Sequence, residues 1–223
     1  MTSNMKPLVL HAHGTGPNPY KIACALELVS VPYEVKLWQF GDAPNGVKGS
    51  QFLKINQNGR VPALEDPNTG VVSWESGAVM NYILRNYDKQ NKLGPRGNSE
   101  QDLVDFEKWT FFLVSTLGPF MGQVNWFKHY HSQKNEDALK RYEEQAYRCF
   151  EVLEGQLKHG GQYILPGSGP SAVDLHFYPW IYQHGFAGLG LDKYPSVGKW
   201  LQGIGELKEV KAAYEKVSKG QEM

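Results

Sequence analysis

The sequence contains little cysteine and no excess of charge of either sign. Its two cysteines, Cys24 and Cys149, are too few for a disulfide framework in a chain of 223 residues, so we expect a reducing compartment. The 23 basic residues balance the 23 acidic ones. This balance excludes the electrostatic footprint of proteins that bind nucleic acid or anionic membrane surfaces, and favours a small-molecule ligand.

The chain also has no long hydrophobic run. Its longest apolar stretch, residues 110–122, is interrupted by hydroxyl residues, glycine and proline. The first six residues lack the apolar core of a signal peptide. We therefore expect no membrane insertion and a cytoplasmic location.

The first ninety residues carry the pattern of a small mixed sheet. Residues 7–13 form a short apolar run and residues 33–38 alternate apolar and charged side chains, so both segments are predicted strands. Between them a helical apolar spacing follows Asn18 and Pro19, where asparagine would be the N-cap and proline the first helical residue. Strand, helix and strand in this succession predict a βαβ unit with a parallel strand pair.

A hairpin and a second helix follow. Residues 61–65 and 71–74 are predicted antiparallel strands, because a turn-rich segment of hairpin length separates them. Ser76 stands at the expected N-cap of the next helix, whose apolar residues recur at helical spacing. The N-terminal part therefore reads β-α-β, then β-β-α.

A break in composition divides the chain. Residues 92–98 are rich in glycine, proline and polar side chains, so we place a linker there between a first domain of residues 1–91 and a second of residues 99–223. Long helical patterns dominate the second domain, which is predicted to be all helical. A Gly118-Pro119 pair is expected to kink its first helix.

The residues between the first strand and helix, Gly14-Thr15-Gly16-Pro17-Asn18-Pro19, lie where a dinucleotide-binding loop would be found. The match fails because a proline replaces the third glycine and two prolines have no N–H to give a pyrophosphate. A tight turn remains that presents Asn18 at a helix N-terminus, where the helix dipole favours negative charge.

Two further motifs follow in order. Arg60-Val61-Pro62 places a proline at the start of a strand, and Glu75-Ser76 places a carboxylate and a hydroxyl at the start of a helix. With the glycine-rich turn and the helical C-terminal half, they make the chain resemble the cytosolic glutathione transferases over nearly its full length. The resemblance implies a thioredoxin-like β-α-β-α-β-β-α domain followed by an all-helical domain.

The resemblance also implies a glutathione site. In the family the proline at the position of Pro62 is cis and exposes the backbone of the preceding residue, here Val61, to the cysteinyl part of glutathione; Arg60 belongs to the same segment. Glu75 would take the γ-glutamyl ammonium, while the Ser76 hydroxyl and helix N–H groups would take its carboxylate.

Within the family, the run from Pro17 to Ile22 is most similar to the branch named after the fungal nitrogen-catabolite regulator and its bacterial relatives. By this resemblance the group that activates the glutathione thiol is Asn18, with Thr15 as the alternative. A donor and a helix dipole lower the thiol pKa, so that the nucleophilic thiolate becomes abundant.

The helical domain is expected to supply two further features. Trp126, Phe127 and Tyr130 are candidates for the pocket that holds a hydrophobic electrophile between the domains, although ordinary helix packing explains each of them equally well. Ser171 and Asp174 match the capping box of the family's central helix, a feature that supports folding rather than catalysis.

No other reactive group is expected to take part. Cys24 falls beside an apolar helical stripe and is predicted to be a buried core thiol. His11 and His13, like His129 and His131, lack the additional ligands that a tetrahedral metal site needs. We expect no metal and no cofactor, with glutathione as a co-substrate.

These features predict a homodimeric enzyme that conjugates glutathione to a small hydrophobic electrophile, in detoxification or in sulfur addition to an intermediate of secondary metabolism. A glutathione-dependent peroxidase or disulfide-bond reductase would use the same site. A third hypothesis is a regulatory protein that binds glutathione without turnover.

Overall fold

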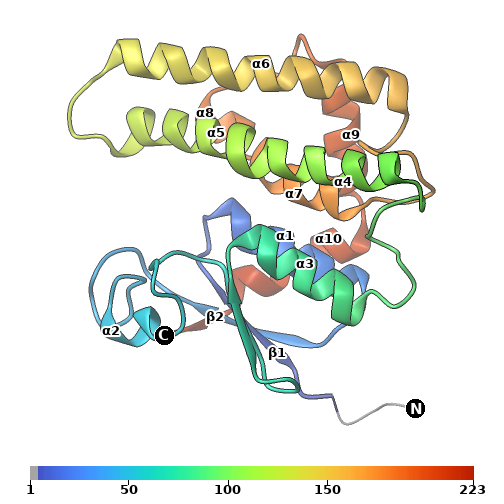
Figure 1. The fold of residues 1–223 in the computed structure, drawn as a ribbon. Helices are drawn as coiled ribbons and strands as arrows, with labels where there is room; N and C mark the ends of the chain where they lie inside the picture. Colours follow the sequence, from blue (N-terminus) through green and yellow to red (C-terminus); the bar gives the residue numbers. More distant parts are fainter. Residues whose placement is uncertain (1–4) are drawn as a thin grey trace. The chain divides into compact units, whose positions relative to one another are not determined.

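A mixed five-stranded sheet, with strand order β4-β3-β1-β2-β5, forms the centre of the N-terminal unit in the computed structural model, which describes residues 5–223 (Figure 1). β1 (Leu8–Ala12) pairs in parallel with β2 (Tyr33–Leu37) and antiparallel with β3 (Ala63–Asp66). β4 (Val71–Trp74) is antiparallel to β3, and β5 (Gln221–Glu222) is parallel to β2. The predicted βαβ unit and hairpin are therefore present.

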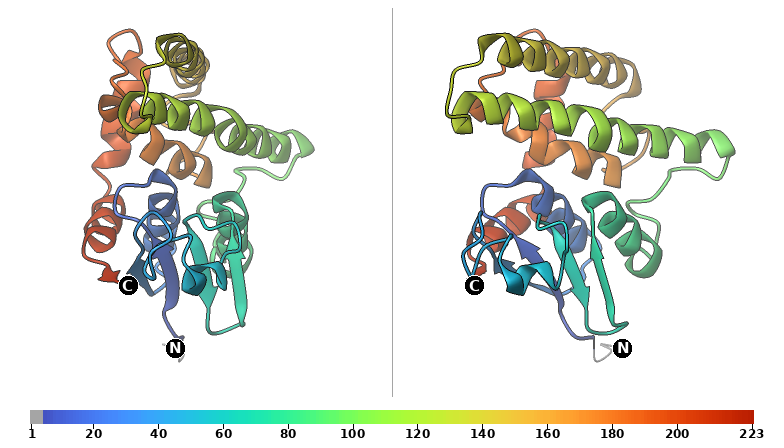
Figure 2. Two further views of the ribbon diagram at one scale, coloured as in Figure 1. Left: turned by 90° about the vertical axis from the view of Figure 1, so that its left-hand side faces the viewer. Right: turned by 60° about the vertical axis from the view of Figure 1, so that its left-hand side comes forward.

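Three helices connect these strands. They are α1 (Pro17–Leu28), the single turn α2 (Ser50–Leu53) and α3 (Ser76–Tyr87). α1 and α3 pack side by side (Figure 2). Leu8, Leu10 and Ala12 of β1 and residues 22–26 of α1 have no solvent exposure. The order β-α-β-α-β-β-α confirms the thioredoxin-like fold.

The predicted N-cap of the first helix is wrong. α1 begins at Pro17 after Gly16, whose extended backbone marks the cap, and Asn18 is already inside the first turn. The N–H groups in the first turn of a helix have no intrahelical acceptor, so proline loses no hydrogen bond there. Both Pro17 and Pro19 therefore fit in the first turn of α1. Asn18 therefore does not cap α1.

The predicted N-cap of the later helix is also wrong by one residue. Glu75 occupies the cap position, with a φ of 67°, and Ser76 is the first residue of α3. The chain turns abruptly out of β4 at Glu75, so α3 begins one residue earlier in the sequence than predicted. Ser76 is nearly buried rather than on the outside of the helix end.

The end of the chain belongs with the sheet. The contacts group Glu206–Met223 with the residues up to Leu93, whereas we expected all of residues 99–223 in the helical domain. α10 (Lys208–Ser218) packs against α1, with the Tyr20 and Tyr214 ring centroids 4.3 Å apart. β5 then adds to the open side of β2 (Figure 2). The C-terminal segment thus packs its helix α10 on α1 and pairs its strand β5 with the edge of β2.

The second unit, Gly94–Gly205, is helical as predicted. Its helices are α4 (Glu100–Phe112), α5 (Gly118–Asn125), α6 (Glu136–Gly160), α7 (Ala172–Tyr182), α8 (His184–Ala187) and α9 (Pro195–Gly205). α6 packs along α5, as Figure 1 shows. No helix within residues 5–223 is both long enough and apolar enough to cross a bilayer.

At the Gly118-Pro119 pair, where a kink was predicted, the structure has a π-helical turn just before the pair. Leu113–Leu117 forms this turn between α4 and α5, and the proline lies in the first turn of α5. A proline removes one helical hydrogen bond, and a locally widened turn accommodates that loss.

Candidate functional site

The sheet topology brings three predicted site segments to the same end of the N-terminal unit. β3 runs antiparallel to β1, with Ala63 opposite His11, so the segment before β3 lies near the turn that follows β1. β4 runs antiparallel to β3, with Trp74 opposite Ala63. Glu75 and Ser76, just after β4, are therefore next to Val61 and Pro62.

The segment before β3 has an unpaired backbone. The Val61–Pro62 peptide bond is cis. Buried Asn56 holds this segment, since its side-chain amide donates to the Arg60 carbonyl at 2.6 Å. Within the described residues no hydrogen bond is made by the N–H or C=O of half-buried Val61. Both groups are free to pair with an extended, peptide-like ligand, as an edge strand does.

The start of α3 combines a strained residue with a nearly buried hydroxyl. Glu75 is exposed and has a positive φ (φ 67°, ψ 117°), a backbone conformation that is uncommon for a residue other than glycine and clusters at functional sites. Ser76 is 7% exposed. The first N–H groups of α3 lack intrahelical acceptors, so this helix end favours an anion.

The turn after β1 distinguishes Thr15 from Asn18. The Thr15 backbone N–H donates to His13 Nδ1 at 3.1 Å, so this ring nitrogen is an acceptor. The Thr15 hydroxyl also lies 3.1 Å from it and therefore donates its proton there. Burial lowers the pKa of His13, which keeps the ring neutral at pH 7. The Thr15 proton is thus engaged with His13. Asn18 lies half-buried in the first turn of α1.

Lys21, which the sequence pattern did not single out, lies beside Ser76. Its side chain is 1% exposed, and its Nζ lies 3.4 Å from Ser76 Oγ, which links α1 to the start of α3. Burial lowers the pKa of Lys21 to about 7, and Glu75 acts in the opposite direction. In the sequence, Lys21 is the single lysine within the apolar run of residues 19–26, all of which are buried in the structure.

The remaining reactive residues have structural roles. Trp38 Nε1–H donates to Nδ1 of buried His11 at 2.9 Å, so the other ring nitrogen, Nε2, donates to Glu65 at 2.7 Å. Cys24 is fully buried in α1, and burial raises the pKa of its thiol. Burial also raises the pKa of Cys149, to about 11. Among residues 5–223 no three histidine, cysteine or acidic side chains are grouped to hold a metal ion.

The three aromatic residues proposed for the electrophile pocket all lie in the second unit, in the π-helical segment Trp126–Tyr130. Trp126 is 48% exposed and Tyr130 is 57% exposed, with ring centroids 6.4 Å apart. Phe127 is half-buried and stacks on Tyr142 at 5.7 Å. Phe127 therefore contributes to packing within its own unit, while Trp126 and Tyr130 present aromatic surface.

Comparisons with known proteins point to one protein family. The family model for the glutathione S-transferase N-terminal domain matches residues 6–85, and the model for the C-terminal domain matches residues 111–208. The chain is 34% identical to the glutathione S-transferase-like protein tpcF of Aspergillus fumigatus, over 89% of this chain and 90% of that protein. It is 37% identical to the similarly named gedE of Aspergillus terreus, over 80% and 79%.

A solved structure is similar over almost the whole chain. The glutathione transferase URE2P6 of Phanerochaete chrysosporium, in complex with oxidised glutathione, superposes with a TM-score of 0.87 at 29% identity. The match covers 98% of this chain and 99% of the other. Both units of the present fold are therefore represented in that protein.

Proposed function

Because the chain belongs to the glutathione S-transferase superfamily, in its fungal Ure2-like branch, we propose that it binds glutathione at the sheet end described above and transfers the thiolate to a small hydrophobic electrophile. The observation that carries the proposal is the juxtaposition of the unpaired Val61 backbone with the start of α3. The cysteinyl part of glutathione pairs with Val61, and Arg60 and Pro62 hold that segment of the site.

The two ends of the γ-glutamyl group meet complementary charges. Exposed Glu75 receives the ammonium, and the Ser76 hydroxyl with the first N–H groups of α3 receives the carboxylate. A charge-assisted hydrogen bond from Asn18 and the N-terminal dipole of α1 stabilise the thiolate. The thiolate then displaces a leaving group such as chloride, forming a carbon–sulfur bond.

The binding site is tested by removal of one hydroxyl. Ser76→Ala should weaken glutathione binding by about 1.5 to 3 kcal/mol, the range for a hydrogen bond to a charged group. Isothermal titration calorimetry measures this change. The control is Ser218→Ala, which removes an exposed hydroxyl that bonds only within α10. Equal affinities of the Ser76 and Ser218 variants would remove Ser76 from the site.

The reaction is tested by offering glutathione together with three acceptors: a chlorodinitrobenzene, a hydroperoxide and a mixed disulfide. Conjugation of the aromatic chloride is the expected activity. Turnover of only the hydroperoxide or the disulfide would instead identify a peroxidase or a reductase. Binding without any turnover would identify a regulatory glutathione-binding protein.

We also propose that the protein is a homodimer. The exposed strand β4 supports this proposal, because an edge strand with exposed Val71 and Val72 provides apolar surface and unpaired backbone groups. Light scattering at micromolar concentration should give twice the chain mass of 25.1 kDa. A mass of one chain would contradict the proposal.

A further inference from the structure

Lys21 is a buried cation directly behind the proposed carboxylate site. It lies on α1, is 1% exposed, and its Nζ is 3.4 Å from Ser76 Oγ. Glu75, the charged group that favours its ionised form, is itself exposed to solvent. Burial of an ammonium group is costly. This location therefore calls for an explanation beyond packing, because methionine would fill a similar volume without the cost.

The hydrogen-bonding chemistry of lysine gives that explanation. An ammonium group has donors and no acceptor, so Ser76 Oγ must accept from Lys21. The hydroxyl proton of Ser76 then points away from Lys21 and is free for an anionic ligand. A neutral amine has a lone pair that can accept this proton instead, and Ser76 would lose its role as a donor to the ligand.

We propose that Lys21, as its ammonium ion, is the positioning residue of the glutathione site: it holds Ser76 as a donor to the γ-glutamyl carboxylate and couples ligand binding to its own protonation. The inference rests on the proposed glutathione binding. It attributes the pH dependence of glutathione affinity to the protonation of Lys21.

The sign of the coupling follows from the burial of Lys21. With a pKa of about 7 in the free protein, its ammonium form is depleted as pH rises from 6 to 8. A bound carboxylate favours the ammonium form, so binding takes up protons near neutral pH. Apparent affinity is proportional to the fraction of protein in the competent form, and it should fall about tenfold over this range.

On the elements packed against α1, Lys216 and His11 have partners of their own, and Arg85 lies in the last turn of α3. On α10, Lys216 lies 3.8 Å from Glu27, which is further along α1 than Lys21. On β1, buried His11 is bonded to Glu65, and burial lowers the pKa of the histidine. Glu75, from the start of α3, is the carboxylate that acts on Lys21.

The test uses S-methylglutathione, which has no thiol proton, and the full-length protein. Calorimetry between pH 6 and 8, in buffers of different ionisation enthalpy, measures both affinity and proton uptake. Wild type should lose about tenfold in affinity with rising pH and should take up protons. Lys21→Met should bind about tenfold more weakly at pH 6, with neither the pH dependence nor the uptake. The control is Lys208→Met, an exposed lysine on α10.

Each outcome decides between the two proposals. Binding by wild type that is independent of pH, or wild-type affinity in Lys21→Met, would overturn the role of Lys21 and leave the glutathione site intact. No binding of S-methylglutathione at any pH would overturn both. Thermal melting checks the fold of the variant, and if Lys21→Met does not fold, proton uptake by wild type alone decides.

Discussion

Asp174→Ala should lower the free energy of unfolding by about 3 to 5 kcal/mol, because it leaves several buried hydrogen-bond donors without their acceptor. Asp174 is fully buried at the start of α7. One carboxylate oxygen accepts from Ile164 N–H and Trp200 Nε1–H, both at 2.9 Å. The other accepts from Ser171 N–H at 2.8 Å and from its hydroxyl at 2.9 Å.

The large expected effect comes from the donors that the variant would leave behind. Burial raises the pKa of Asp174, and these four hydrogen bonds act against that rise because they favour the charged carboxylate. Without the carboxylate, the buried N–H groups of Ile164 and Trp200 lose their acceptor. An unsatisfied buried donor costs about 1 to 3 kcal/mol.

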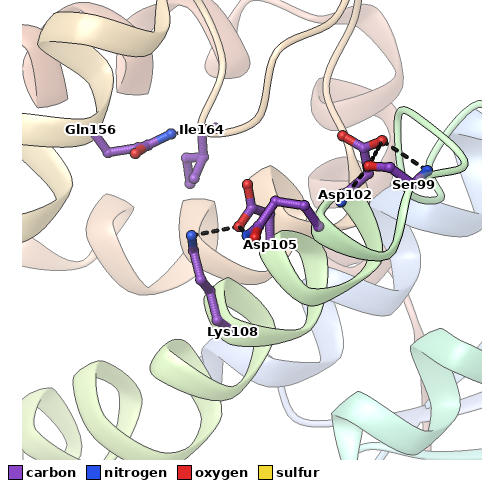
Figure 3. Close-up of polar contacts among 7 residues, drawn as sticks. Ser99, Asp102, Asp105, Lys108, Gln156 and Ile164 are labelled. Atoms are coloured by element: carbon purple, nitrogen blue, oxygen red, sulfur yellow. Dashed lines mark hydrogen bonds and ion pairs between the residues drawn. The ribbon is translucent and has the colours of Figure 1, made fainter.

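The chain contains a matched control for this experiment. Ser99 and Asp102 form the same reciprocal capping box at the start of α4, but in an exposed position (Figure 3). Asp102→Ala should therefore cost only about 1 kcal/mol, as for an ordinary helix cap. Urea unfolding followed by circular dichroism gives both values. Equal losses would mean that burial and the two additional donors contribute nothing at Asp174.

The two capping boxes show what local sequence can and cannot predict. The spacing of Ser171 and Asp174 suffices to place a helix start, because the box involves only neighbouring backbone groups. The contacts of Asp174 with Ile164 and Trp200 join segments separated along the chain, and no local pattern encodes them. The same spacing at Ser99 and Asp102 also marks a helix start, that of α4.

The fold itself was largely predictable, because alternation and helical spacing are strong signals. All four strands of the N-terminal half and its two long helices were expected, whereas the single turn α2 followed only from the family resemblance. The helix starts at Asn18 and Ser76 were misplaced, since backbone angles at Pro17 and Glu75 decide them. The addition of β5 to β2 depends on a long-range edge contact that has no local signature.

Asn18→Ala should raise the pKa of the bound glutathione thiol by about one to two units, equivalent to about 1.4 to 2.7 kcal/mol. A donor to the thiolate is lost, so turnover at neutral pH should fall, while affinity carried by Val61, Glu75 and Ser76 should change little. Because Asn18 is not the N-cap of α1, the variant loses no capping hydrogen bond. Ultraviolet titration of the thiolate in the complex measures the shift.

Two further variants separate activation from stability. Asn18→Asp keeps the shape of the side chain and adds a negative charge that the N-terminus of α1 favours, but it has no N–H to donate. It should therefore raise the thiol pKa more than Asn18→Ala, and thermal melting of both variants checks that the fold is retained. Thr15→Val should leave the titration unchanged, because the Thr15 hydroxyl already donates to His13. A shift in the Thr15 variant, with none in either Asn18 variant, would make Thr15 the activating residue.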